Sequence, residues 1–354
     1  MGEDCQGSLC MPNEKACAFL RHPTLKEGQA AFAREFVKVL KMIYRDKLLI
    51  VDAARCGLSR VYFTKYLLYF YELALASCAT CEVVHLLNVN KSLTSLAGLF
   101  GLKKVVSYQF SYLPAVHSNW KVKKALIECG SKIVIGTSRR IANLFGNGVF
   151  IYPPVNIELF KPREKEYVRR LLGLPPNKII IGYIGDIDIN RGFDVVAKLA
   201  AELGSDDIKF LITYPRIDNI TRNVMVNIKK ALKKNSLIVK RTVPVWYVFN
   251  AIDVLLLPIR NSYLTEPPAT LLEALASGTP VIGGPSPSMK DYEALYIKVK
   301  DDDYFLDVVK QTIDMRKELT ELSIRAREFA TKNLSYQAVL QRLSKIVNMS
   351  RLFN

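Results

Sequence analysis

Residues 178–203, KIIIGYIGDIDINRGFDVVAKLAAEL, join a β-branched run to an amphipathic run through a short turn that contains glycine and charged residues. The first part is typical of a strand buried on both faces, because its apolar residues follow one another without alternation. The part from Gly192 to Leu203 has apolar residues at the spacing of a helix that covers a sheet. A strand that passes through a turn into a helix is the repeating unit of parallel sheets, so this stretch predicts an α/β fold.

The same alternation of β-like and helical runs extends in both directions, beginning at ACAFL (16–20). Residues 152–178 interrupt it with two proline pairs and a charged middle, which is typical of a connection between domains. We therefore predict two doubly wound, parallel-sheet, Rossmann-like domains, 1–160 and 161–334, and a helix, 335–354, that packs back on the first domain. Loops at the carboxyl ends of the two sheets are expected to face a cleft between the domains.

The chain has 354 residues and a formal charge of +17, and the positive excess is concentrated near the start. Residues 1–165 hold 23 basic and 12 acidic side chains. Such a surface attracts nucleotide phosphates, anionic lipid headgroups or nucleic acid, and charge alone does not choose among them. Because there is no charge-free apolar run of 18 residues and no signal-like start, we expect a cytoplasmic protein. The basic first domain suggests a peripheral position on the inner face of the membrane.

The seven cysteines do not form a recognisable metal-binding pattern. Cys5, Cys10 and Cys17 would need a fourth ligand to hold a metal ion. Cys78 and Cys81 have a metal-like or redox-like spacing, but no second pair follows at the spacing of a zinc finger. We favour free thiols or a disulfide over a metal site, and we predict no metal ligands.

Residues 265–284, TEPPATLLEALASGTPVIGG, predict a helix followed by a strand. Pro267 and Pro268 suit a first helical turn, because proline has a helical φ and lacks the N–H that would be unpaired there. The helix is expected to begin just after Glu266 and to end at Gly278.

Two carboxylates and three amides are expected to gather at the start of this helix. Glu266 and Glu273 are seven residues apart, which places them on nearly the same helix face. The amides of Ala269, Thr270 and Leu271 point out of the helix start and, with the helix dipole, form an anion site. A diphosphate fits these amides, and a carboxylate accepts hydrogen bonds from ribose or sugar hydroxyls. The alternative is that both glutamates only favour the first turn electrostatically.

Several stretches of the chain together resemble the family-4 retaining glycosyltransferases, which have two Rossmann domains in the GT-B arrangement. The resemblance extends over about residues 16–349 and is strongest in the second half. It rests on the following stretches: IGYIGDIDINRGFDVVAKLAAEL (181–203), AIDVLLLPIRNSYLTEPP (251–268), EALASGTPVIGG (273–284), the linker FIYPPVNIELFKP (150–162), and HPTLKEGQAAFAREFVKVL (22–40), which is similar to the family's first glycine loop and helix.

The resemblance implies a role for each matching residue. Glu273 matches the glutamate that binds the nucleotide ribose, and Glu266 is expected to serve the donor sugar. Arg191 matches a cation that neutralises the diphosphate and acts in catalysis. The other residues expected to bind the donor are Gly28, Gly185, Arg260, Ala269, Thr270 and Leu271.

Three positions depart from the family pattern. Glu266 is displaced by one residue, because the family's glutamates are commonly eight positions apart. Asp186 stands where members usually have a basic residue, so it is expected to repel a diphosphate, and Arg260 or a lysine of the first domain would compensate. Gln109 stands where many members have a histidine. These changes imply an altered donor or a weakened enzyme.

The resemblance also implies a mechanism. The acceptor attacks on the face from which the diphosphate leaves, and a phosphate oxygen takes the proton. Arg191 and the helix amides stabilise the leaving group, without a metal ion or another cofactor. The expected donor is a nucleotide-diphosphate sugar, and the expected acceptor is a lipid-linked saccharide, a glycan or a protein.

Two other functions are compatible with the sequence. The charge and the run KKALKKNSLIVKR (229–241) suit a nucleic-acid-binding protein, but no aromatic residues for base stacking are interleaved with the lysines, so we interpret the run as a solvated helix face. Asp186 suits a catalytically silent scaffold with the same fold.

Overall fold

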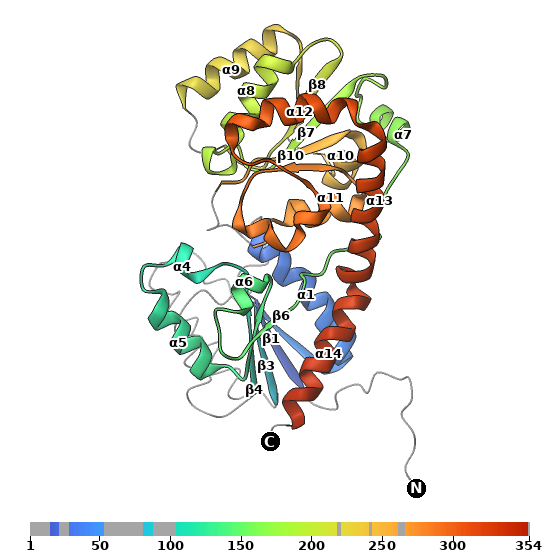
Figure 1. Ribbon diagram of the computed structural model, residues 1–354. Coiled ribbons are helices and arrows are strands. Elements are labelled where there is room, and N and C mark those ends of the chain that lie inside the picture. The colour runs from blue at the N-terminus through green and yellow to red at the C-terminus, as the bar shows by residue number, and fades with distance from the viewer. Residues whose placement is uncertain are drawn as a thin grey trace. The chain divides into compact units, whose positions relative to one another are not determined.

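The computed structural model describes residues 15–20, 28–52, 81–87, 104–217, 221–240, 243–260 and 266–352 (Figure 1). The chain divides into two compact units. Unit 1 comprises Met1–Pro154, Tyr263–Pro267 and Ser335–Asn354, and unit 2 comprises Val155–Ser262 and Pro268–Leu334. The first boundary therefore falls a few residues before the predicted one, and Glu266 belongs to unit 1. The alternation in the sequence also predicts helices after KLLIVDA (47–53) and after EVVHLL (82–87), and both lie outside the described residues.

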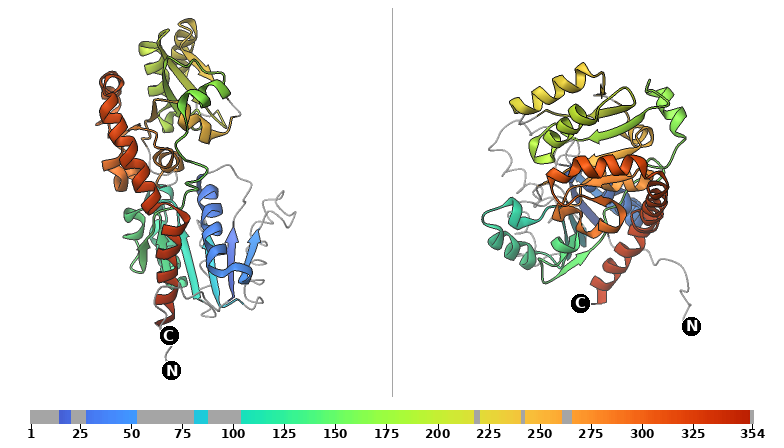
Figure 2. Two further views of the ribbon diagram at one scale, coloured as in Figure 1. Left: turned by 90° about the vertical axis from the view of Figure 1, so that its right-hand side faces the viewer. Right: turned by 45° about the horizontal axis from the view of Figure 1, so that its top comes forward.

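Unit 1 contains a parallel six-stranded sheet with the order β2-β1-β3-β4-β5-β6. Its arrows run side by side in Figure 1 and in the left view of Figure 2. The strand predicted at residues 16–20 is confirmed as β1, because a continuous apolar run suits a strand that helices cover on both faces. The strands are β1 (Ala16–Leu20), β2 (Leu48–Asp52), β3 (Val83–Leu87), β4 (Lys104–Gln109), β5 (Ile133–Gly136) and β6 (Gly148–Phe150).

The C-terminal helix packs against the first helix within unit 1. Tyr336 at its start donates a hydrogen bond to Glu35, and Lys38 Nζ donates to the Tyr336 hydroxyl at 3.1 Å. The helices of this unit are α1 (Gly28–Tyr44), α4 (Leu113–Val116), α5 (Trp120–Gly130), α6 (Arg139–Ala142) and α14 (Tyr336–Leu352).

A neutral histidine lies in the core of unit 1. His85 on β3 is fully buried between two tyrosines: its Nδ1 lies 2.9 Å from the Tyr108 hydroxyl and its Nε2 lies 3.0 Å from the Tyr44 hydroxyl. Burial lowers the pKa of His85 to about 3. The imidazole therefore stays uncharged at neutral pH and serves as a hydrogen-bonding core residue.

Unit 1 is expected to lose stability through His85 as the pH falls below about 6.5. The unfolded chain takes up a proton near that pH, whereas the folded chain resists protonation down to about 3. Between these values the contribution of His85 falls by about 1.4 kcal/mol per pH unit. Urea unfolding of wild type and His85→Gln at several pH values measures this. The stability gap between the two proteins should shrink as the pH falls, and a constant gap would contradict the assignment.

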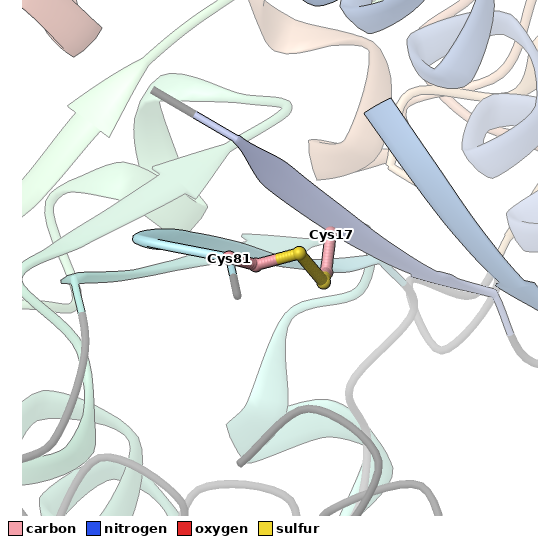
Figure 3. The surroundings of a disulfide bond; sticks show 2 residues. All are labelled: Cys17 and Cys81. Atoms are coloured by element: carbon pink, nitrogen blue, oxygen red, sulfur yellow. A yellow bond between two sulfur atoms is a disulfide. The ribbon is translucent and has the colours of Figure 1, made fainter. Parts of the chain in front are cut away.

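A disulfide joins β1 to the residue pair that precedes β3. Cys17 and Cys81 are buried, with Sγ atoms 2.23 Å apart and Cα atoms 5.9 Å apart (Figure 3). Cys17 is therefore not available as a metal ligand, whereas Cys5, Cys10 and Cys78 lie outside the described residues. Among the described cysteines, Cys129 is a free, exposed thiol.

Unit 2 contains a second parallel six-stranded sheet with the order β12-β11-β10-β7-β8-β9. Apolar side chains of β7, β8 and β10 form its buried core with those of the helix that follows β7. The strands are β7 (Ile179–Ile184), β8 (Ile208–Thr213), β9 (Leu237–Val239), β10 (Val254–Leu257), β11 (Val281–Gly283) and β12 (Ile297–Lys298). Two parallel sheets confirm the predicted fold class.

Helices and strands alternate along unit 2, from α7, which precedes β7, to α12 and α13, which follow β12. Short 3-10 helices η2 (Ile189–Arg191), η3 (Pro287–Leu295) and η4 (Asp302–Tyr304) lie between them. The α-helices are α7 (Lys165–Leu171), α8 (Phe193–Leu203), α9 (Arg222–Lys233), α10 (Val245–Ala251), α11 (Ala269–Ser277), α12 (Phe305–Asp314) and α13 (Arg316–Asn333). Among the helices that the structure describes, none has both the length and the apolar content needed to cross a bilayer.

Helix α7 lies inside the stretch predicted to be a connection between domains. Its buried Arg169 side chain holds several segments together by hydrogen bonds. Arg169 is 4% exposed and donates to the carbonyl oxygens of Ala251, Pro176 and Lys178 at 2.7–3.0 Å. It also donates to Asp253 Oδ2 at 2.7 Å. These contacts fasten the first part of unit 2 to the amino ends of β7 and β10.

Candidate active site

The carboxyl ends of β10, β7 and β8 lie side by side in unit 2, because β7 pairs with β10 on one side and with β8 on the other. The chain changes direction across the sheet between β7 and β10. Open α/β sheets bind ligands at such a switch point, outside the carboxyl ends of the strands. Three segments leave the sheet here: the turn after β7, the loop after β8, and the chain from β10 to α11.

The start of α11 presents two amides. Those of Ala269 and Thr270 donate to no acceptor among the described residues, and both residues are partly exposed. The Leu271 amide donates to the Pro268 carbonyl oxygen at 3.1 Å. This corrects the prediction of three open amides, because the carbonyl that caps the helix takes the third one. Two donors and the helix dipole are available to an anion.

The turn after β7 lies directly on the chain that leaves β10. Gly192 has a φ of 73°, and a Cβ at this position would lie 2.0 Å from the Pro258 carbonyl oxygen, so only glycine fits. Gly185, which is predicted to bind the donor, has space around it: a Cβ there would meet no atom closer than 3.4 Å. The close approach at Gly192 holds its neighbour Arg191 beside the exit of β10.

Asp186 is held between two arginines at this turn. Arg216 donates from Nε to Oδ1 at 3.2 Å and from Nη2 to Oδ2 at 2.9 Å. Nη2 of Arg191 lies 3.2 Å from the same Oδ2. The structure corrects the expectation that Asp186 repels a diphosphate, because two guanidinium groups share this one carboxylate.

Arg216 is the residue of this cluster that the sequence analysis missed. It lies 30 positions from Asp186, so no local spacing connects the two. The available signal was a basic residue just after a buried strand, at the edge of the sheet where ligands bind. The Arg216 side chain is 55% exposed and that of Arg191 is 27% exposed, so both are accessible from solvent.

Arg260 is occupied by carboxylates of unit 2. Its Nη1 and Nη2 donate to the two oxygens of Asp194 at 2.9 and 2.8 Å, and its Nε donates to Asp302. Partial burial opposes its charge, but these hydrogen bonds prevail and raise the pKa of Arg260. The expectation that Arg260 compensates for Asp186 at a diphosphate is therefore corrected: two acidic side chains already neutralise it, and it fastens α8 and η4 to the end of β10.

Glu266 is also bound within the protein. Its side chain is fully buried in unit 1, where it accepts hydrogen bonds from Ser138 Oγ at 2.7 Å and from Arg140 Nε at 3.1 Å. Its amide donates to the Phe110 carbonyl oxygen at 2.8 Å. Glu266 precedes α11 and is not part of it, so the seven-residue spacing does not place it on the helix face of Glu273. The prediction that it reaches the donor sugar from the helix mouth is corrected on this ground.

Glu273 lies on α11, one turn beyond the two open amides, and is partly buried. It is the one acidic residue of that helix. Gly28, which is predicted to bind the donor, is the first residue of α1 in unit 1. Gln109 is the last residue of β4 and is fully buried.

The Asp186-Ile-Asp188 sequence forms a turn between β7 and η2. Asp188 Oδ1 accepts the Asn190 amide at 2.9 Å and caps η2, while Asp186 binds the two arginines. Over the described ranges of the chain, no group of three or more His, Cys, Asp or Glu side chains is placed to hold a metal ion.

Residues 164–329 match the model of the family described as glycosyl transferases group 1. This range makes up most of unit 2 and contains the arginine cluster and α11. No curated protein sequence matches the chain.

Solved structures of glycosyltransferases are similar to the chain over nearly its whole length. HepE of Anabaena, in complex with UDP, has a TM-score of 0.78 at 13% identity and covers 94% of this chain and 100% of its own. Sucrose-phosphate synthase of Thermosynechococcus elongatus has a TM-score of 0.75 at 15% identity, with 96% and 100% covered. A glycosyltransferase of Rickettsia africae has a TM-score of 0.72 at 16% identity, with 96% and 99% covered. The chain therefore has the GT-B type fold, and its residues 164–329 match the group 1 glycosyltransferase family.

Proposed function

We propose that the chain transfers a sugar from a nucleotide-diphosphate donor to an acceptor, with retention of anomeric configuration and without a metal ion. The observations that carry this proposal are the pair of open amides at the start of α11, Arg191 in the turn after β7 and Arg216 in the loop after β8. Amides at a helix start and guanidinium groups are the donors that phosphate oxygens bind in proteins. Both lie at the switch point of the sheet, where α/β folds bind nucleotides.

In the proposed mechanism, binding groups stabilise the leaving diphosphate. The amides of Ala269 and Thr270 bind phosphate oxygens, and Arg191 and Arg216 balance the charge that develops as the glycosidic bond breaks. The acceptor hydroxyl attacks from the same face, and a phosphate oxygen accepts its proton. No protein nucleophile takes part, and Glu273 binds the hydroxyls of the nucleotide ribose.

We propose a UDP-sugar as the first donor to test, because HepE, with a similar fold, has been crystallised with UDP-glucose. The proposed acceptor is a lipid-linked saccharide, a glycan or a protein, which the chain reaches as a peripheral protein at the inner face of a membrane. The positive charge of the chain, +17, supports both an anionic donor and an anionic surface.

A thermal-shift panel of UDP-, GDP-, ADP- and TDP-sugars tests the donor site. A donor at about 100 times its Kd stabilises the folded protein by about 2.7 kcal/mol, which is a shift of several degrees. We expect one nucleotide class to stabilise wild type and to leave Glu273→Ala almost unshifted, because the variant lacks the ribose-binding carboxylate.

Glu321→Ala is the matched control, because Glu321 is exposed on α13. It should shift as wild type does. An equal shift in Glu273→Ala would contradict the role of Glu273. The absence of a shift with every donor would favour a catalytically silent scaffold.

A further inference from the structure

Helix α9 combines a strong positive charge with exposed aliphatic side chains. The segment from its N-cap, Thr221, to Lys234 contains no acidic residue. Its basic residues are Arg222, Lys229, Lys230, Lys233 and Lys234. The helix lies beside α8 at the edge of unit 2 in Figures 1 and 2, where it is yellow.

One face of α9 is used for packing. Val224 and Ala231 are buried and belong to the core cluster of unit 2, with Ile228 packed against them. The remaining surface of the helix exposes three large apolar side chains. Met225 and Val226 are each 44% exposed, and Leu232 is 54% exposed.

The exposed apolar and basic side chains form neighbouring rows along the helix. Residues seven positions apart lie within about 20° of each other around a helix axis. Met225 and Leu232 therefore form one row, and Arg222 and Lys229 form the next row, about 60° away at ~100° per residue. Lys233 lies just beyond the second row. Aliphatic groups beside a cationic ridge are the arrangement found in helices that lie on membrane surfaces.

We propose that the outer face of α9 docks on a membrane that contains anionic lipids. Met225 and Leu232 would enter the boundary between headgroups and acyl chains, while Arg222, Lys229 and Lys233 pair with lipid phosphates. This inference supplies the docking surface for the membrane association in the proposed function. It differs from the sequence-based interpretation of this run as a solvated face, because that interpretation did not include the exposed aliphatic residues.

The observations favour a membrane over nucleic acid. The exposed residues of α9 include no aromatic side chain on which a base could stack. Phosphate contacts to nucleic acid use the lysines but give no role to Met225, Val226 and Leu232. A lipid surface uses both kinds of side chain, and it attracts each nearby cation with about a fivefold gain in binding.

Vesicle co-sedimentation of the full chain, without donor, tests the proposal. The vesicles contain phosphatidylcholine alone or with phosphatidylglycerol. Wild type should bind the anionic vesicles more tightly. Lys229→Gln with Lys233→Gln should weaken that binding about 25-fold, since two cations are lost. Met225→Gln with Leu232→Gln should weaken it about tenfold, because apolar insertion is lost.

Ile324→Gln with Lys317→Gln is the matched control, because both residues are exposed on α13. It should bind as wild type does. Unchanged thermal melting and an unchanged donor shift in every variant show that the fold and the donor site are intact, so docking and donor binding can fail separately.

Three results would overturn the proposal. The first is equal binding to neutral and anionic vesicles, or binding that neither α9 variant weakens. The second is that the protein binds a random DNA or RNA oligonucleotide, and that Lys229→Gln with Lys233→Gln weakens this binding whereas Met225→Gln with Leu232→Gln does not. That result would assign the face to nucleic acid. The third is a wild-type dimer by light scattering that Met225→Gln with Leu232→Gln converts to a monomer, which assigns the face to a second copy.

Discussion

Arg191→Gln is expected to lower kcat/KM for sugar transfer by about 100- to 1,000-fold, the effect of removing one preorganised donor to a developing charge. The fold should survive, because Arg216 keeps both of its hydrogen bonds to Asp186 at 3.2 and 2.9 Å. The Kd for the nucleoside diphosphate should rise about 10- to 100-fold, since a hydrogen bond to a charged group contributes about 1.5–3 kcal/mol. Calorimetric titration and single-turnover transfer with the stabilising donor measure the two effects.

Arg325→Gln controls for the loss of one positive charge, because Arg325 is exposed on α13. It should leave both constants unchanged. Arg216→Gln should also weaken diphosphate binding, which distinguishes a shared arginine cluster from a site built on Arg191 alone. Wild-type affinity for the diphosphate in Arg191→Gln would remove this turn from the donor site.

Arg169→Leu is expected to destabilise unit 2 by roughly 3–5 kcal/mol, because it leaves the partners of a buried charge unpaired. Three carbonyl oxygens and Asp253 Oδ2 would lose their donor together. Asp253 would keep its hydrogen bonds from the Ile180 amide and from Lys165 Nζ, both at 2.7 Å. Lys165 is more exposed than Arg169, the other cationic partner of Asp253. Urea unfolding followed by circular dichroism measures the loss.

Lys165→Leu is the matched comparison, because Lys165 binds the same carboxylate from a side chain that is 46% exposed. Exposed ion pairs contribute about 0–1 kcal/mol, so this variant should unfold near the wild-type midpoint. Equal losses in the two variants would show that the ion pair, rather than the buried carbonyl contacts of Arg169, carries the effect.

The strands and most helices of the described chain were predictable because their signals are local. Continuous apolar runs mark strands that are covered on both faces, and this held for β1, β7 and β10. Stop and start residues are local too: Gly278 ends α11 with a φ of 66°, as expected for a glycine C-cap. α7 was missed, because prolines and charges on either side of it hide a short helix whose stability comes from the contacts of Arg169.

The sequence did not predict which residues bind the charged side chains of the site. Glu266 was assigned to a sugar from its position next to a helix, but its carboxylate is bound by Ser138 and Arg140, about 130 positions away in the chain. Arg260 was assigned to a phosphate, but Asp194 and Asp302 hold it. A charge near a strand end is visible in the sequence, whereas the group that neutralises it comes from another strand or helix.

By itself, the amino-acid sequence determined two parallel-sheet units, the helix that ends at Gly278, and a turn that places Arg191 after β7. These follow from residue spacing, proline and glycine positions, and the burial of apolar runs. Only the tertiary structure decided that Arg216 joins Asp186, that Glu266 is enclosed in unit 1, and that α9 leaves aliphatic side chains uncovered. The physical reason is that burial and ion pairing depend on which strands become neighbours, and strand order brings together residues that no local pattern links.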